Sequence, residues 1–398
     1  MLALNTSFFL RLIIIALAVA PAFALGDDNR NLFLIGVMLL SPIIILTSKS
    51  FRTPDLLLIF FMLSIVFIPW MYQPESMRWS TVMYSIMFCL TFIAYNRLLY
   101  KDVFSIENYQ KLLKYLIYAY FIMLLIQQFS VLLGLPVLNI SNHDMSDPWK
   151  LNSLAAEPSH SARIVALLMF SYIVIKELTL ERKYSFNLDF KNDRMVWIAF
   201  LWTMLTMGSA TAIVFIIIIL LKFIHYRTLI PYLVLGTIGL YVLITLGNES
   251  INRSLDFFLA VLTFDIQNMM TVDHSASMRI APMIVIADKI DFSSLNGWFG
   301  YGIDYTSNLI SKKIHGIPEG ATGGALLQLL IEYGFVSFIL FVVFSIFNTY
   351  DKKNKLTLVL WFMLIFLAGV NNQIVWLAIV LLFTNNYFSE IKGKLNEN

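Results

Sequence analysis

The chain has 398 residues and a mass of 45.7 kDa, and hydrophobic residue types make up 59% of it against 13% for charged types. Soluble domains have roughly 45–50% apolar and about 25% charged residues, so the composition excludes a soluble globular enzyme and a disordered chain. The net charge of +3 is too small for a nucleic-acid-binding surface, and a single cysteine, Cys89, excludes an intramolecular disulfide or a cysteine-based metal site. The composition therefore indicates an all-α integral membrane protein.

Apolar runs follow one another along most of the chain, and a membrane span needs about 20 mostly apolar residues. We expect twelve transmembrane helices near residues 8–25, 32–47, 55–70, 80–95, 112–135, 159–176, 195–207, 210–224, 229–246, 322–347, 356–370 and 373–388. The first of these runs also has the features of a cleavable signal peptide, whose removal would leave the orientation of the other spans unchanged.

Two of the runs, 195–224 and 356–388, are too long for one span and short for two. We expect them to be broken at Gly208-Ser209 and at Asn371-Asn372-Gln373. With these breaks, most Lys and Arg residues fall on one side of the membrane, which the positive-inside rule identifies as the cytoplasm. Both termini are then cytoplasmic, and two long segments, 136–158 and 247–321, lie outside as parts of one polytopic membrane domain over residues 1–398.

The first external segment ends in a polar cluster that includes Glu157, His160 and Arg163. Pro158 suits the first turn of a helix, so Glu157 is expected at the N-cap. His160 and Arg163 are three residues apart and share a helix face. Since helix N-termini favour anions, this cluster could hold a lipid pyrophosphate; the alternative is that Glu157 only caps the helix and Arg163 reaches the headgroups.

The second external segment contains an amphipathic stretch that starts near Arg279. Ile280, Met283, Ile284 and Ala287 have helical spacing, so we expect a helix that lies on the bilayer surface with Arg279 facing water or phosphate. A tight turn at 297–302 follows, and its glycines are not a nucleotide-binding loop because no strand precedes them.

One acidic residue, Glu332, falls in the middle of a predicted span. We expect it to hydrogen-bond a neighbouring helix rather than to act in catalysis. The scarcity of charges within the spans argues against a proton-coupled pump. The sequence shows no zinc-protease, nucleophile-elbow or P-loop pattern, and neither a metal ion nor another cofactor is expected.

Taken together, these stretches resemble the bacterial O-antigen polymerases of the Wzy type, within the O-antigen polymerase and ligase superfamily. The similarity lies in Glu157-Pro158-Ser159 before a span, Arg279 in the large late loop, Gly300-Tyr301-Gly302 after it, and the LxxLxExG run from Leu326 to Gly334. Ligases of this superfamily carry a His just before that run, where this chain has Gly323 and Gly324, and this favours a polymerase.

The resemblance implies a metal-independent glycosyl transfer at the periplasmic face of the inner membrane, on a fold with features of the GT-C glycosyltransferases. The donor and acceptor would be oligosaccharide repeat units linked to undecaprenyl pyrophosphate. Arg279, and after it Arg163, would neutralise the departing pyrophosphate, and Glu157, His160 and His315 compete for the role of base. The expected partners are these lipids, the bilayer, a chain-length regulator and a flippase for the repeat units, but no nucleic acid. A ligase acting on lipid A-core and a transporter of lipid-linked sugars stay open as alternatives.

Overall fold

The computed structural model describes residues 6–20, 31–48, 51–101, 104–139, 147–223, 256, 259–272, 274–314 and 325–397. Over these residues the protein is built of helices, and no strand is formed. The predicted span at 229–246 lies outside the described residues, as do His143 and His315.

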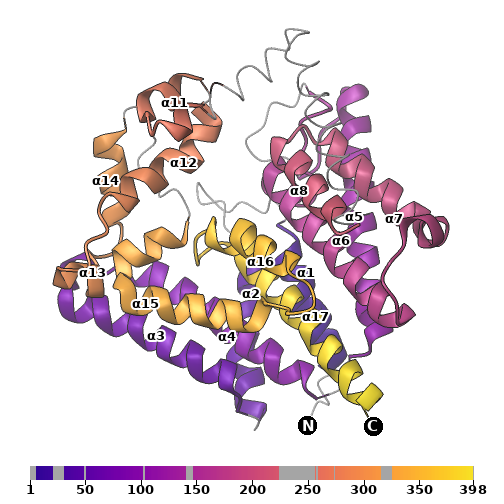
Figure 1. Cartoon of the computed structure of the whole chain (residues 1–398), viewed down its shortest axis with the longest axis horizontal. Coiled ribbons are helices and arrows are strands. Elements are labelled where there is room, and N and C mark those ends of the chain that lie inside the picture. The colour runs from indigo at the N-terminus through magenta and orange to yellow at the C-terminus, as the bar shows by residue number, and fades with distance from the viewer. Residues whose placement is uncertain are drawn as a thin grey trace.

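Helices far apart in sequence form the body of the protein (Figure 1). The N-terminal helices are α1 (Thr6–Ala18), α2 (Leu32–Thr47), α3 (Thr53–Tyr72), a short 3-10 turn η1 (Pro74–Ser76) and α4 (Trp79–Leu99). The middle group consists of α5 (Ile106–Leu132), α6 (Pro158–Leu180), α7 (Phe186–Thr206) and α8 (Ala210–Leu221). The C-terminal helices are α15 (Leu326–Thr349), α16 (Leu356–Trp361), the π-helical turn η2 (Phe362–Phe366) and α17 (Gln373–Glu397).

Within the described ranges, five helices are long and apolar enough to cross a membrane. They cover Thr53–Tyr72, Trp79–Leu99, Ile106–Leu132, Leu326–Thr349 and Gln373–Gly393. Shorter apolar helices cover Thr6–Ala18, Leu32–Thr47, Ala210–Leu221 and Leu356–Phe366. These elements agree with the fold class expected from composition, a helical multi-pass membrane protein.

The two predicted helix breaks are confirmed. Gly208 has a positive φ of 64° between α7 and α8, a backbone conformation that suits glycine. The Asn371-Asn372-Gln373 break separates η2 from α17. The start of α7 differs from the prediction, because the helix begins at Phe186 rather than near residue 195. Its first turns are too polar for a hydropathy criterion, but the Asp189 carboxylate accepts from the Ser185 amide at 2.9 Å and stabilises them.

Helices α6 and α17 lie at the centre of the molecule and contact each other. Their apolar side chains are buried on nearly all sides, as a helix surrounded by others requires. Helix α15 packs along α3, and α5, α7 and α8 pack around α6. This arrangement leaves four small helices of the second external segment outside the main bundle.

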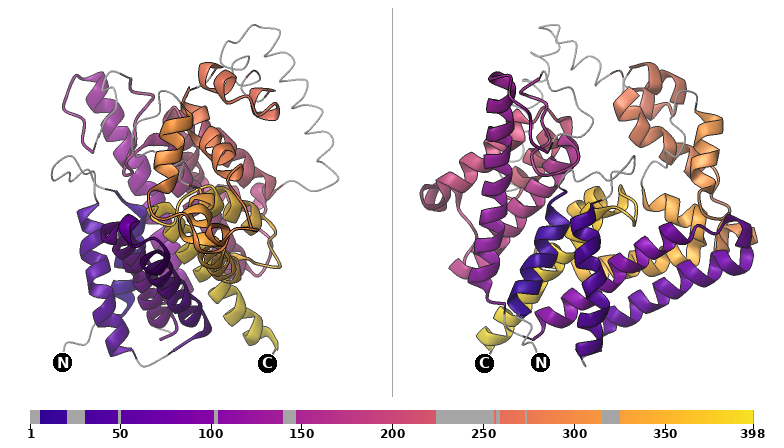
Figure 2. Two further views of the ribbon diagram at one scale, coloured as in Figure 1. Left: turned by 90° about the vertical axis from the view of Figure 1, so that its left-hand side faces the viewer. Right: turned by 180° about the vertical axis from the view of Figure 1, so that it is seen from behind.

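These four helices are α11 (Ile266–Val272), α12 (His274–Ala287), α13 (Leu295–Phe299) and α14 (Tyr305–Lys313). In all views α11, α12 and α14 lie at the end of the molecule opposite the C-terminus (Figures 1 and 2). They share a small apolar core in which Ala281 and Ile286 of α12 pack with Ile310 of α14 and Ile331 of α15.

The predicted amphipathic helix is present as α12. Ala281, Val285 and Ile286 are buried within the protein. On the apolar face that was expected to lie on the bilayer, Ala287 is exposed and the other three residues are half-buried. The helical spacing correctly identified an amphipathic helix. It could not show that α14 and α15 supply a protein surface for the other side of that helix.

Candidate functional site

The start of α6 is held by a network of buried amide side chains in the first external segment. Gln127 of α5 donates to the Ser153 carbonyl oxygen at 3.2 Å and accepts from the Ser153 amide at 2.8 Å. Asn152 donates to the carbonyl oxygens of Asn139 and Ala155 at 2.8 and 2.7 Å. Because these groups are buried and satisfied, the segment that leads into α6 has a fixed path.

Glu157 occupies the N-cap of α6 and Pro158 the first turn, as predicted, but the Glu157 side chain makes no capping hydrogen bond. Its carboxylate instead accepts from the Ser159 hydroxyl at 3.2 Å and lies 4.0 Å from His160 Nε2. Half of the Glu157 side chain is exposed, and His160 and Arg163 are half-buried. A carboxylate and an imidazole are thus adjacent and accessible, which is the arrangement a proton acceptor requires.

Arg279 lies in α12, two residues before the buried Ala281. Its side chain, like all of His315, falls outside the described part of the protein. The end of α6 is joined to the end of α17 by Lys392, which lies 3.2 Å from Glu181. The start of α6 therefore lies away from the C-terminus, at the same end of the molecule as α12 (Figure 2).

The Gly300-Tyr301-Gly302 motif and the Glu332-Tyr333-Gly334 stretch are in direct contact. The amide of Tyr301 donates to the Ile331 carbonyl oxygen at 2.8 Å, and the amide of Gly302 donates to the Glu332 carbonyl oxygen at 3.2 Å. Gly334 has φ 81° and ψ 171° and kinks α15 at this point. A Cβ atom at Gly334 would lie 2.2 Å from the Trp298 carbonyl oxygen, and one at Gly300 would lie 2.3 Å from that of Glu332. Both glycines are required because the two backbones touch.

Glu332 is buried and hydrogen-bonds a neighbouring helix, as predicted. The Thr306 hydroxyl of α14 donates to Glu332 Oε1, and Gln328 Nε2 lies 3.2 Å from each carboxylate oxygen. These contacts join α14 to α15 at the level of the kink. They also replace part of the hydration that a buried carboxylate loses.

A cavity of about 370 Å³ opens beside Glu332, where the ends of several helices meet. Its polar lining includes Arg78 before α4, Asp304 before α14, Gln328 and Glu332 of α15, and Asn371 after η2. Arg78 Nη1 pairs with Asp304 Oδ2 at 3.0 Å, and Asn371 accepts from the Ser85 hydroxyl. Residues from three separate connections between helices, before α4, before α14 and after η2, therefore meet at this cavity.

Tyr333 also lines the cavity, and its side chain is 6% exposed. Its hydroxyl is buried and, among the described residues, has no hydrogen-bond partner. A buried hydroxyl without a partner costs about 1–3 kcal/mol. Such a group is expected where a bound ligand supplies the missing partner.

A layer of side-chain amides connects the cavity region to the start of α6. Gln373 donates to the carbonyl oxygens of Leu17 and Val19 at 2.8 and 3.1 Å, and so binds the end of α1. The next residue, Ala20, donates its amide to the Leu154 carbonyl oxygen at 2.8 Å, three residues before Glu157. A chain of hydrogen bonds thus runs from Gln373, two residues after Asn371, to the segment that precedes Glu157.

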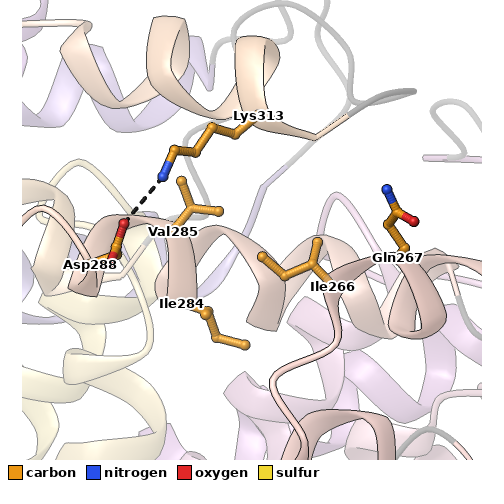
Figure 3. A pocket seen from close by; sticks show the side chains of 6 residues that line it. All are labelled: Ile266, Gln267, Ile284, Val285, Asp288 and Lys313. Carbon is orange, nitrogen blue, oxygen red and sulfur yellow. Dashed lines mark hydrogen bonds and ion pairs between the residues drawn. The ribbon is translucent and has the colours of Figure 1, made fainter.

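A second cavity, of about 280 Å³, lies within the external helices (Figure 3). Ile266 of α11 and Val285 of α12 form its apolar part, and an exposed ion pair of 3.2 Å between Asp288 and Lys313 borders it. The two charged groups of this lining, Asp288 and Lys313, are paired with each other at the surface.

The sequence pointed to the motif glycines and to Glu332 but not to Arg78, Asn371 or the Tyr333 hydroxyl. These residues come from segments far apart in the chain, and each alone is an ordinary loop or span residue. The one sequence feature that could have pointed to Asn371 is the polar break Asn371-Asn372-Gln373 between two apolar runs. Comparison with models of known protein families and with curated proteins gives no match to this chain.

Proposed function

We propose that the protein is an O-antigen polymerase that joins oligosaccharide repeat units linked to undecaprenyl pyrophosphate at the periplasmic face of the inner membrane. The observation that carries the proposal is the contact between Gly302 and Glu332 beside a polar cavity. Two short motifs of the resemblance, 24 or more residues apart in sequence, are thereby in one place. The proposal includes twelve spans, cytoplasmic termini and a GT-C-like arrangement.

In the proposed reaction, a hydroxyl of the acceptor repeat unit attacks the sugar carbon that bears the pyrophosphate of the donor. The new glycosidic C–O bond forms as the bond to the pyrophosphate oxygen breaks, and undecaprenyl pyrophosphate leaves with the electron pair. The hydroxyl proton passes to a base, for which Glu157, His160 and His315 are the candidates. Arg279 and Arg163 stabilise the charge that develops on the leaving pyrophosphate.

The position of Glu157 and His160 supports their assignment. They are adjacent, partly exposed and at the same end of the molecule as α12, the helix that contains Arg279. A base and a cation that serve one sugar phosphate must lie on the same side of the membrane. The layer of amides around Gln373 links the start of α6 to the cavity region and supports a single active face.

Reconstitution tests the proposal. The purified protein in lipid nanodiscs is incubated with undecaprenyl-pyrophosphate-linked repeat units and no nucleotide sugar. A ladder of products with increasing numbers of repeat units is the expected result. A requirement for lipid A-core as the acceptor would instead identify a ligase, and movement of the lipid-linked sugar without a new bond would identify a transporter.

A further inference from the structure

The cavity beside Glu332 is lined by both apolar and polar side chains. Phe61, Leu329 and Val370 contribute carbon surface, and Asn371 and Gln328 contribute amide groups. A sugar ring has the matching character, with C–H groups on its faces and hydroxyls around its edge. The volume of about 370 Å³ lies near the lower end of the range for small-molecule sites, about 300–1,000 Å³, and has room for a sugar ring rather than a long oligosaccharide.

Tyr333 gives an independent indication of a ligand. Its side chain is more than nine-tenths buried, it lines the cavity, and its hydroxyl has no partner among the described residues. Glu332, the preceding residue, by contrast accepts hydrogen bonds from Thr306 and Gln328 and keeps further acceptor capacity. A ligand that enters the adjoining cavity would supply the partner that this hydroxyl of Tyr333 lacks.

The charges around the cavity favour a neutral ligand over a pyrophosphate. Arg78 is the cation of the lining, and it is already paired with Asp304 at 3.0 Å. Among the described lining residues there is no other cation, so the cavity offers no unpaired positive charge to a pyrophosphate. The Asp304 carboxylate can accept hydrogen bonds from sugar hydroxyl groups, and the Arg78 guanidinium can donate to them.

We propose that this cavity is the subsite for a neutral sugar ring of the lipid-linked substrate, held by the Tyr333 hydroxyl and the carboxylate and amide groups around it. The proposal rests on the proposed function for the identity of the substrate. It separates sugar recognition, in the cavity beside Glu332, from pyrophosphate binding by Arg279 and Arg163.

Binding of a free sugar tests the subsite without requiring catalysis. The probe is the water-soluble repeat-unit oligosaccharide, released by mild acid from the lipid-linked intermediates and titrated against the protein in nanodiscs by saturation-transfer NMR. Tyr333→Phe should weaken binding about threefold to tenfold, the usual effect of one hydrogen bond. Tyr305→Phe is the matched control, because Tyr305 stacks on Tyr301 and does not line the cavity. It should bind like the wild type.

Thermal unfolding of the same variants separates binding from folding. Tyr333→Phe removes a hydroxyl that has no partner in the described structure, so its melting temperature should equal or exceed that of the wild type. Loss of binding with retained stability supports the subsite. Glu332→Gln should also weaken binding; if that variant fails to fold, Tyr333→Phe still decides the question.

Three results of the binding experiments would overturn the subsite. Equal sugar affinity in the wild type and Tyr333→Phe would show that the cavity is not the binding place. If inorganic pyrophosphate competes with the sugar, and Tyr333→Phe changes that competition, the cavity is an anion site. If sugar binding requires Na⁺, the cavity is a cation site.

If sugar binding depends on Tyr333 but no polymer ladder forms, the polymerase function fails while the subsite stands. If a ladder forms with the same acceptor KM in the wild type and Tyr333→Phe, the subsite fails while the polymerase function stands.

Discussion

The amide of Gly302 donates a hydrogen bond to the carbonyl oxygen of Glu332, with 3.2 Å between the two atoms. This bond joins a turn of the external segment to the helix that carries the buried carboxylate. The non-helical backbone at Gly334 interrupts the regular i to i−4 pattern of α15, and the turn supplies donors for the carbonyl oxygens there. The kink and the turn therefore stabilise each other.

The glycine at this kink should not tolerate a side chain. Gly334→Ala places a Cβ atom 2.2 Å from the Trp298 carbonyl oxygen at a φ of 81°, and we expect a loss of about 1–3 kcal/mol in stability. Thermal unfolding in detergent measures it. Gly36→Ala in α2 is the control, because nothing lies within 4 Å of its Cβ position and alanine favours a helix. A Gly334→Ala protein as stable as Gly36→Ala would contradict the close contact.

The ion pair between Arg97 and Asp55 should be important for folding. Arg97 Nε lies 2.9 Å from Asp55 Oδ2, both side chains are largely buried, and Arg97 also donates to the Ser48 carbonyl oxygen at 3.1 Å. Arg97→Ala leaves a buried carboxylate unpaired, so we expect a loss of about 3–5 kcal/mol. Lys313→Ala removes an exposed ion pair and should cost at most about 1 kcal/mol. Similar melting temperatures for the two variants would contradict the importance of the buried ion pair for folding.

The contact between Arg182 and Asp189 should give a pH-dependent contribution to stability. The Arg182 guanidinium binds both carboxylate oxygens, at 2.6 and 2.8 Å, and holds the pKa of Asp189 below its ordinary value. A lowered pKa stabilises the folded state above the unfolded value of about 3.9, and this contribution is lost as the pH falls through the folded pKa.

The difference in unfolding temperature between the wild type and Arg182→Gln should therefore be constant near neutral pH and shrink below about pH 4. Arg194→Gln, at an exposed position in the helix that contains Asp189, is the control and should show no such change with pH. A difference that grows on acidification would have the wrong sign for a carboxylate with a lowered pKa.

Arg279 should be required for chain extension. If it neutralises the departing pyrophosphate, Arg279→Ala should reduce the rate of polymer formation by about 10²–10³-fold while the protein still inserts into the membrane. The length distribution of the polysaccharide and the amount of protein in the membrane are measured together. Lys312→Ala, an exposed cation of the same external segment, should leave extension unchanged. Normal long chains in Arg279→Ala would remove this residue from the site.

Glu157→Gln distinguishes a proton acceptor from a helix cap. The Glu157 side chain makes no capping hydrogen bond, so its replacement by an isosteric amide should leave stability nearly unchanged. If Glu157 is the base, the rate should fall by about 10²–10⁴-fold. Glu75→Gln, at an exposed position in η1, is the control. If Glu157→Gln extends chains at the wild-type rate, His160 and His315 are left as the candidates for the base.

Local features of the fold could be predicted from the sequence, because the signals are local. Gly208 and the Asn371-Asn372-Gln373 stretch end helices through backbone freedom and polarity, and Pro158 begins one through its fixed φ. The hydrogen bond of Glu332 to another helix could be predicted since a buried carboxylate needs a donor.

The composition of the cavity could not be predicted in this way. Arg78, Asp304 and Asn371 meet there through the packing of α4, α14 and α15 with η2, and no short-range pattern encodes such a meeting. The contacts of α12 with α14 and α15 could not be predicted for a related reason. Apolar spacing shows that a face is covered but not whether lipid or protein covers it.

The hydrogen bonds of Gln373 to Leu17 and Val19 have a consequence for the end of α1. The last carbonyl oxygens of a helix have no partner within it, and the hydrocarbon layer of a membrane has no water to supply one. The Gln373 side-chain amide takes the place of that water. Helix α1 can therefore end at a level where its carbonyl groups would otherwise stay dry and unpaired.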